Sequence, residues 1–235
     1  MRKPQAGFTL IEIAIVLVII GLLLGGVLKG QELITSARVR NLISQQDGIK
    51  AAYFGFLDRF RALPGDYATA NAAANIRGVT FGGNGDGQIL DAGGNSEQVI
   101  AWNHLASAGF LNGSYTMTAA NDAVADANTP KNPYAIYLQL IWDANYADAG
   151  TAAVKHNLKT GNQIPVEILA EVDRKIDDGS PMQGSFRFSR YTPASATGLS
   201  AAAGTYAAGV CANSTSPGSW YATQSETNCG GSSLF

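Results

Sequence analysis

Charge, cysteine and histidine are all scarce in this sequence, and each scarcity excludes a class of protein. Charged residues make up 14% of the chain and the formal net charge is -2, so no basic surface for binding nucleic acid is expected. The two cysteines lack the two-residue spacing of metal knuckles and redox pairs. Neither His104 nor His156 has a Cys, Asp and Ser pattern nearby in sequence that would suggest zinc or catalysis. We therefore predict that the protein is not an enzyme.

Cys211 and Cys229 both lie in the C-terminal region, which is rich in Gly, Ser and Thr. A disulfide between them would stabilise the fold by roughly 3 kcal/mol in the chain-entropy model. Such a bond persists in an oxidising compartment such as a bacterial periplasm. The alternative is two unpaired small side chains.

Proline is absent between Phe8 and Leu63, and an apolar run from Phe8 to Leu28 contains a single charge. A helix of this length spans the hydrocarbon core of a membrane. Arg2 and Lys3 precede the run, which favours a cytoplasmic N-terminus. The small residues of an ordinary signal-peptide cleavage site follow the apolar stretch, whereas here Ala6 and Gly7 come before it. We therefore expect the apolar segment to remain in the mature protein.

The single charge in the apolar run is Glu12. A carboxylate at mid-membrane depth costs roughly 2.5–3.5 kcal/mol on insertion scales, so it favours a partner. No basic residue lies within one helical turn, which leaves a lipid headgroup, water, or a positive charge on another chain. Alternatively, Glu12 lies near the cytoplasmic interface and stays hydrated.

The segment Gly7-Phe8-Thr9-Leu10-Ile11-Glu12 resembles the processing and methylation site of type IV prepilins and type II secretion pseudopilins. The resemblance implies that a prepilin peptidase in the inner membrane cuts after Gly7 and methylates Phe8. It also implies that Glu12 and Phe8 act in assembly, because the glutamate meets the N-terminal amine of a neighbouring copy. The implied partners are further copies of the chain, the peptidase, the inner membrane, and the pilus or secretion assembly machinery.

This sequence departs from many major pilins because it lacks a helix-kinking proline in the outer part of the segment. Four glycines still permit bending or local melting, since glycine costs about 1 kcal/mol in a helix. They are Gly21, Gly25, Gly26 and Gly30. A smooth helix and a locally melted segment both remain open.

The sequence predicts an α+β fold in which a long N-terminal hydrophobic helix packs against an antiparallel β-sheet head, as in type IV pilins. Pro64-Gly65 ends the helix. The expected divisions are a leader (1–7), a transmembrane and filament-core helix (8–28), an amphipathic stalk helix (29–63) and a periplasmic or extracellular globular head with a C-terminal Cys loop (64–235).

Within the head, hydrophobic patterning predicts two shorter helices and several strands. The first helix runs from Asn95 or Ser96 to about Ala108. The second helix covers Pro165 to Asp177. The predicted strands are Tyr134–Trp142 at the centre of the sheet, a neighbour near Val154–Leu158, and Ser185–Arg190.

A glycine-rich stretch within 81–91 resembles part of a calcium loop. Asn84, Asp86 and Asp91, with the carbonyl of Gln88, could supply hard oxygen ligands. Alignment to an EF-hand fails at the first and last ligand positions, where glycines stand. The alternative is a series of Asx turns. Calcium is thus a possible cofactor, and none is required.

Three further carboxylates, Asp173, Asp177 and Asp178, come at the end of the second helix beside basic residues, and we expect them to be solvated charges. The best-supported function is a structural subunit of a type IV pilus-like filament. A type II secretion pseudopilin is the alternative within the family. A membrane-anchored periplasmic binding domain is the alternative from another class.

Overall fold

A computed structural model describes residues 9–92, 95–189, 211–213, 218–223 and 227–235. The chain divides into two compact units, which we call the N-terminal unit (Met1–Arg38) and the head unit (Val39–Phe235). Helix α1 (Leu10–Phe60) contributes residues to both units. The prediction of one long helix without an internal proline is therefore confirmed, with its end four residues before Pro64.

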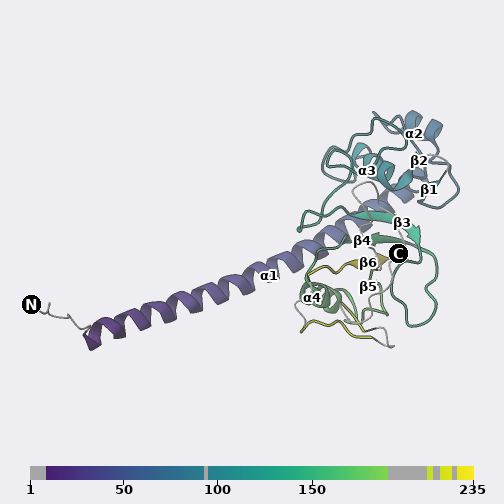
Figure 1. The fold of residues 1–235 in the computed structure, drawn as a ribbon. Coiled ribbons are helices and arrows are strands. Elements are labelled where there is room, and N and C mark those ends of the chain that lie inside the picture. The colour runs from purple at the N-terminus through teal and green to yellow at the C-terminus, as the bar shows by residue number, and fades with distance from the viewer. Residues whose placement is uncertain (1–8, 93–94, 190–210, 214–217, 224–226) are drawn as a thin grey trace, which may run out of the picture. The chain divides into compact units, whose positions relative to one another are not determined.

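The head unit is built on a four-stranded antiparallel sheet with the order β3-β4-β6-β5 (Figure 1). Its strands are β3 (Gln139–Asp143), β4 (Lys155–Lys159), β5 (Phe186–Phe188) and β6 (Gly231–Leu234). In the register of the sheet, Ile141 faces Asn157 across β3 and β4, and Leu158 faces Ser233 across β4 and β6. A small separate pair joins β1 (Asp91–Ala92) to β2 (Asn95–Ser96). The α+β class is confirmed.

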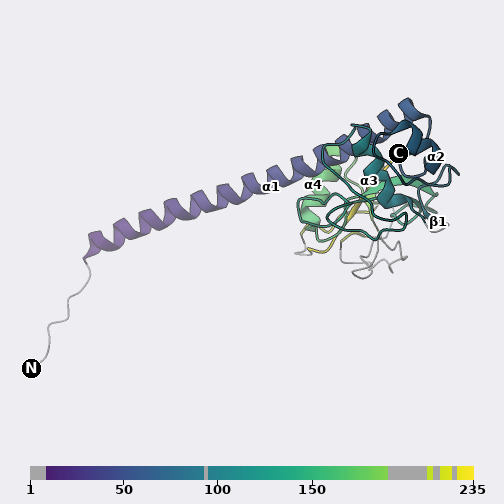
Figure 2. The ribbon, with the colours of Figure 1, turned by 90° about the horizontal axis from the view of Figure 1, so that it is seen from above.

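Three shorter helices occur in the described part of the head unit: α2 (Thr69–Asn75), α3 (Glu97–Ser107) and α4 (Val166–Ile176). Contacts place α3 against β3 and α4 against β5, at opposite edges of the sheet. Figure 2 shows α3 and α4 from above, beside the head part of α1. Helices α3 and α4 match the predicted helices closely, whereas α2 is a third short helix that was not predicted.

Two clusters of buried side chains form the core of the head unit, and the head part of α1 contributes to both. Ile49 and Phe56 pack with Trp102 of α3 and with Leu140 and Leu158 of the sheet. The second cluster joins α1, α4, β5 and the disulfide, and it contains Val39, Leu42, Leu169, Val172, Phe186, Trp220 and Cys229. Burial of apolar surface on this scale is the main force that holds α1 to the rest of the head.

The prediction of a central strand over Tyr134–Trp142 is wrong in two respects. The strand begins only at Gln139, and β3 lies at an edge of the sheet. Before it, the Asn132 side chain accepts hydrogen bonds from the backbone N–H groups of Tyr134 (2.8 Å) and Ile136 (3.0 Å). An asparagine that binds nearby backbone groups in this way favours a turn over a strand.

Candidate assembly helix and N-terminal processing segment

The part of α1 that belongs to the N-terminal unit has no buried side chain among its described residues. Leu10 is 89% exposed and Leu22 is 73% exposed. The same holds for other large apolar side chains along this part, including Ile11, Leu17, Val18, Leu23, Leu24 and Leu28. A helix that is apolar on all sides requires an apolar environment, either lipid or protein. This surface is the candidate functional site.

Thr9 and Glu12 form a capping box at the start of α1. The backbone N–H and the hydroxyl of Thr9 donate to Glu12 Oε2, at 2.7 and 2.8 Å. In return, the backbone N–H of Glu12 donates to Thr9 Oγ1 at 3.3 Å. Reciprocal bonds of this kind satisfy N–H groups that a helix leaves unpaired at its start, and so they stabilise the first turn. Glu12 therefore has neutral donors on its own chain, a partner that the sequence analysis did not consider.

The glycines of the N-terminal unit do not interrupt α1, which is helical through Gly21, Gly25, Gly26 and Gly30. A Cβ atom added at any of them would meet no other atom within 4 Å. The surface there is open, so a second helix could approach the backbone closely.

Helix α1 contains a stretch that is long and apolar enough to cross a membrane, judged by length and composition. Lys29 and Glu32 follow the apolar run and form an exposed ion pair at 2.7 Å. Charged side chains at this position are typical of the boundary between hydrocarbon and water. The membrane-spanning prediction therefore fits the segment up to Leu28.

Of the predicted processing and assembly residues, Gly7 and Phe8 lie outside the described residues. Glu12 lies in the first turn of α1 and is exposed. The structure therefore describes only the assembly glutamate of this set, and the processing site stays a prediction.

The proposed calcium loop contains Asx turns. Asn84 Oδ1 accepts the backbone N–H of Asp86 at 2.9 Å, and Asp86 Oδ1 accepts that of Gln88 at 2.9 Å. The Asn84 side-chain amide also donates to Asp86 Oδ2 at 3.0 Å. Asp91 begins β1, and its side chain lies outside what the structure describes. Oxygens that already accept backbone hydrogen bonds favour the turn interpretation, and the calcium site stays a prediction.

Two buried carboxylates that the sequence analysis missed hold this loop in place. Asp66 accepts the backbone N–H groups of Gly85 (2.7 Å), Asp86 (3.0 Å) and Gly87 (2.9 Å). Glu97, at the start of α3, accepts those of Asn84 and Leu90, both at 3.0 Å. Burial raises the pKa of Glu97 to about 7, although these two backbone hydrogen bonds act in the opposite direction.

The two histidines are structural, but neither is at the surface. His104 is fully buried on α3. Its Nδ1 accepts the Gly65 backbone N–H at 3.1 Å, and its Nε2 lies 2.8 Å from the Phe81 carbonyl oxygen, so Nε2 carries the proton. Burial lowers the pKa of His104 to about 4. His156 is half-buried on β4, with its ring 4.6 Å from that of Trp142.

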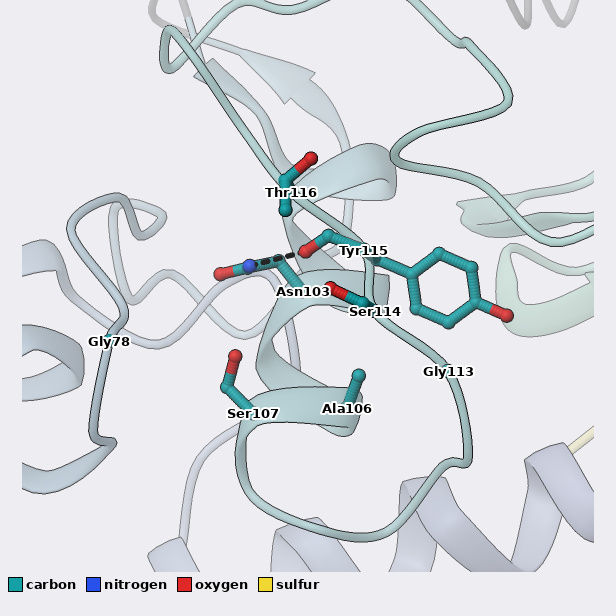
Figure 3. Close-up of a pocket in the computed structure, with 8 residues that line it drawn as sticks. All are labelled: Gly78, Asn103, Ala106, Ser107, Gly113, Ser114, Tyr115 and Thr116. Carbon is teal, nitrogen blue, oxygen red and sulfur yellow. Dashed lines mark hydrogen bonds between the residues drawn. The ribbon is translucent and has the colours of Figure 1, made fainter.

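A pocket of about 320 Å³ opens on the head unit beside α3 (Figure 3). The residues around it are small or neutral, and the side-chain amide of Asn103 donates to the Tyr115 carbonyl at 2.6 Å. Figure 3 shows the Tyr115 ring pointing away from the other labelled side chains. The lining therefore offers hydrogen bonds from amide and hydroxyl groups, but no charged side chain.

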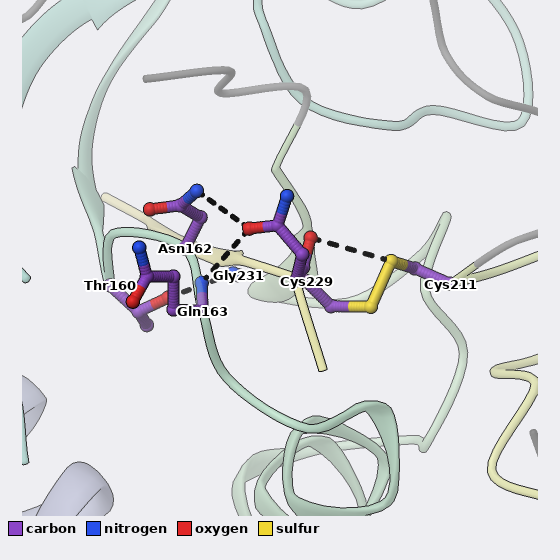
Figure 4. Close-up of a disulfide and its surroundings, with 7 residues drawn as sticks. Thr160, Asn162, Gln163, Cys211, Cys229 and Gly231 are labelled. Carbon is purple, nitrogen blue, oxygen red and sulfur yellow. Dashed lines mark hydrogen bonds between the residues drawn. A yellow bond between two sulfur atoms is a disulfide. The ribbon is translucent and has the colours of Figure 1, made fainter. Parts of the chain in front are cut away.

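Cys211 and Cys229 form the predicted disulfide, with their Cα atoms 5.8 Å apart (Figure 4). Cys229 and Ile164 exchange two backbone hydrogen bonds of 3.1 Å each. The Asn162 amide donates to Asn228 Oδ1 at 2.7 Å. These bonds attach the cysteine loop to the segment that leads into α4, so the disulfide joins the sheet, α4 and the C-terminal residues.

The comparisons with known proteins address only the N-terminal end of the chain. The model of the prokaryotic N-terminal methylation motif matches residues 2–28. A search of curated proteins and a search of solved structures each find no match to this chain. The matched segment covers the predicted leader, Glu12 and the exposed apolar surface. The chain therefore carries the prepilin-type N-terminal segment that is the hallmark of type IV pilins and pseudopilins.

Proposed function

We propose that this protein is a structural subunit of a type IV pilus-like filament and that it polymerises through the apolar part of α1. The observation that carries the proposal is the exposed apolar surface of Leu10–Leu28, with Glu12 within it. A membrane covers such a surface before assembly. In a filament, the same surface of neighbouring copies would cover it, and lipid would be replaced by protein of similar polarity.

Close packing of these helices would supply much of the stability of the filament. Helix association in an apolar medium depends on van der Waals contact, and small residues allow backbones to approach each other. Gly21, Gly25 and Gly26 provide such positions, since no other atom of the chain approaches them. The large side chains between them would fill the remaining space.

Glu12 would set the axial register of neighbouring copies. Its carboxylate would attract the N-terminal amine that processing creates at Phe8 of an adjacent copy. Attraction between opposite charges is strong in a medium of low dielectric, and leaving one partner alone there is costly. The two Thr9 donors hold the carboxylate in a fixed position at the start of the helix, which would orient it before the partner arrives.

Processing would precede assembly. A prepilin peptidase would cut after Gly7 and methylate Phe8, with the N-terminus on the cytoplasmic side and the head unit in the periplasm. Pilus or secretion assembly machinery would then extract the subunit into a filament that extends to the surface or spans the periplasm. An oxidising compartment for the head agrees with the Cys211–Cys229 disulfide.

Two measurements in the native host test this proposal together. Mass spectrometry of the mature protein should show a chain that begins with a methylated Phe8. Electron microscopy of sheared cells should show filaments that contain the protein and that are lost in Glu12→Ala. Glu32→Ala is the matched control, because Glu32 is an exposed glutamate on the same helix beyond the apolar run. Normal filaments from Glu12→Ala, or a mature chain that keeps residues 1–7, would contradict the proposal.

The same experiments distinguish the alternatives. A pseudopilin would be processed at Gly7 but would not be abundant in the sheared surface fraction. A membrane-anchored binding domain would keep its leader and would remain monomeric in lipid, and the arrangement of Gly7 and Glu12 would then have no role. The pocket in Figure 3 would be the first place to look for a ligand in that case.

A further inference from the structure

The end of α4 brings three carboxylates together in the head unit. Oxygens of Asp173, Asp177 and Asp178 lie within 4.8 Å of one another. Asp178 and Asp177 are exposed, but Asp173 is fully buried. The sequence-based expectation of solvated charges is therefore wrong for Asp173. Burial follows from its position on the face of α4 that also carries Leu169 and Val172, which pack into the second core cluster.

The two oxygens of Asp173 have different surroundings. Oδ2 accepts a hydrogen bond from Trp220 Nε1 at 2.5 Å, which connects α4 to the disulfide loop. Oδ1 is buried, and no N–H or hydroxyl group among the described residues donates to it. One side-chain oxygen of Asp177 lies within 4.8 Å of an oxygen of Asp173, so the two carboxyl groups are direct neighbours. A buried carboxylate oxygen without a donor is costly, unless the group carries a proton or a cation compensates its charge.

Asp177, in contrast, is surrounded by donors. Its Oδ2 accepts the Phe186 backbone N–H at 2.9 Å, the Ser185 hydroxyl at 3.1 Å and the Ser185 backbone N–H. Its Oδ1 accepts the Asp178 backbone N–H at 2.8 Å. Burial acts to raise the pKa of Asp177, but the hydrogen bonds from Asp173 and from these backbone groups lower it. Asp177 is therefore the ionised member of the pair.

No basic side chain in the described ranges forms an ion pair with these carboxylates. On α4, Arg174 and Lys175 both bind Glu171, at 3.1 and 2.8 Å. On β5, Arg187 binds Asp148. On the part of α1 that shares the second core cluster, Arg40 is exposed. The disulfide loop faces Asp173 with Trp220, which does not titrate. Among the described residues, Asp177 and Asp178 are the charges that act on Asp173, and both act to raise its pKa.

From this geometry we propose that Asp173 and Asp177 share one proton, and that this proton holds the end of α4, the start of β5 and the disulfide loop together. The proton resides on Asp173, whose hydroxyl donates to the Asp177 carboxylate. Trp220 donates to the other oxygen of Asp173. Two carboxylates in contact cannot both be ionised in a buried site without a large cost, as in other carboxyl pairs that share a proton.

Loss of the shared proton to solvent would leave two adjacent negative charges. Burial, and then the contact with Asp177, raise the pKa of Asp173 to about 8, so this loss falls in the mildly alkaline range. An ionised Asp173 would recruit water, and its contact with Trp220 would weaken. The disulfide loop would then separate from α4, while the sheet, which is paired through its own backbone, would persist.

A divalent cation is the other possible occupant of this cluster. Asp177 already accepts four hydrogen bonds, from Ser185, Phe186 and Asp178, and so has little capacity left for a metal. Calcium takes six to eight oxygen ligands, which is more than this exposed cluster readily provides. The proton accounts for the same contacts without a further ligand. A cation is therefore an outcome of the test that would overturn the proposal.

The experiment compares the full chain in detergent micelles with Asp173→Asn between pH 6 and pH 9.5. An asparagine keeps an oxygen for Trp220 and an N–H for Asp177, but it has no proton to lose. The unfolded chain loses this proton near pH 4 and the folded chain only near pH 8, so we expect the wild-type thermal midpoint to fall as pH rises from 6 to about 8 and to level off above that. The Asp173→Asn midpoint should fall less over that interval, because only other groups such as Glu97, whose pKa is about 7, still contribute to the change. Asp178→Asn, at the exposed member of the cluster, is the control and should behave as the wild type does.

A second measurement keeps the test decisive if Asp173→Asn does not fold. Carbon-13 NMR of the wild-type aspartate carboxyl groups should show one resonance that titrates near pH 8, while the Trp220 indole N–H resonance moves with it. An Asp173 carboxyl that titrates below pH 5, or equal midpoint curves for wild type and Asp173→Asn, would overturn the proposal. A rise of the wild-type midpoint in 1 mM calcium chloride at pH 7, absent in Asp173→Asn, would also overturn it and assign a cation.

Discussion

Two parts of one helix behave in opposite ways in this molecule. From Leu10 to Arg38, α1 has no buried side chain, whereas from Val39 to Phe60 it has seven. Both parts are helical, so helix propensity does not distinguish them. The difference is that the head unit supplies apolar packing partners for the second part, whereas the described residues bury no side chain of the first. An apolar surface without partners in its own chain requires them from a membrane or from other copies.

Removing a buried aromatic side chain from the second part of α1 should have the greatest effect on the stability of the head. Phe56 is 0% exposed, and its ring lies near those of Phe60, Tyr67, His104 and Phe110. Phe56→Ala should lower the free energy of unfolding of the head by about 4 kcal/mol, because it removes apolar burial and leaves a cavity. Chemical denaturation of the protein in micelles, followed by far-UV circular dichroism, measures this change.

Phe54→Ala is the matched control for that experiment. Phe54 is the same residue type two positions earlier on the same helix, but it is 50% exposed. Its replacement should cost about 1 kcal/mol or less. If the two variants lose equal amounts of unfolding free energy, burial of side chains in the head does not stabilise this part of α1.

The difference between the two parts could be predicted only in outline from sequence. The apolar run to Leu28 and the spacing of Leu42, Ile49 and Phe56 indicated both helical parts, because these signals are local. Helix α4 was predicted for the same reason, from Ile168, Leu169 and Val172 on one face. The Thr9–Glu12 capping box also has a local signature, a threonine followed three residues later by a glutamate, and it was not among the predictions.

Features that depend on distant segments were not predictable. Strand β6 consists of Gly231, two serines and Leu234, which have little intrinsic preference for a strand. It forms because β4 and β5 pair with it on both sides. Asp173 looked solvated among its charged neighbours, but Trp220, 47 positions away, covers it. Asp66 and Glu97 likewise act on a loop that lies 7 to 21 residues from them.

The disulfide offers a second, smaller test of how the head holds together. Cys211→Ser with Cys229→Ser should lower the free energy of unfolding of the head by about 3 kcal/mol, since the bond restricts a loop in the unfolded chain. Denaturation of the double variant beside the wild type measures the loss, and reduction of the wild type should reproduce it. The helicity of the N-terminal unit should not change, because the bond lies entirely in the head. A loss of helicity beyond that of the head would contradict this separation.

Acid should weaken the head through His104. Its pKa is lowered from 6.5 to about 4 by burial, so between these values the unfolded chain binds a proton that the folded chain does not. The free energy of unfolding therefore falls as pH decreases from 6.5 towards 4. A glutamine can accept from Gly65 and donate to Phe81 as the histidine does, but it does not titrate. From pH 7 to pH 4.5 the wild type should lose about 2 kcal/mol more than His104→Gln. Parallel pH curves for the two proteins would refute this.

A smaller change in the free energy of unfolding is expected at Gln46, a polar residue within the buried face of α1. Gln46 is fully buried, and within the described part of the chain neither its amide nitrogen nor its oxygen has a hydrogen-bond partner. A buried amide without partners is costly, and an apolar side chain of similar volume avoids that cost. Gln46→Met should therefore raise the free energy of unfolding by about 1 kcal/mol, measured by denaturation at pH 7.

Gln45→Met is the comparison variant. The Gln45 amide donates to the Lys131 carbonyl at 2.8 Å, so the loss of this hydrogen bond should destabilise the head. If Gln46→Met is also destabilising, an internal water binds the Gln46 amide. The buried contact between α1 and the rest of the head would then contain bound water as well as apolar side chains.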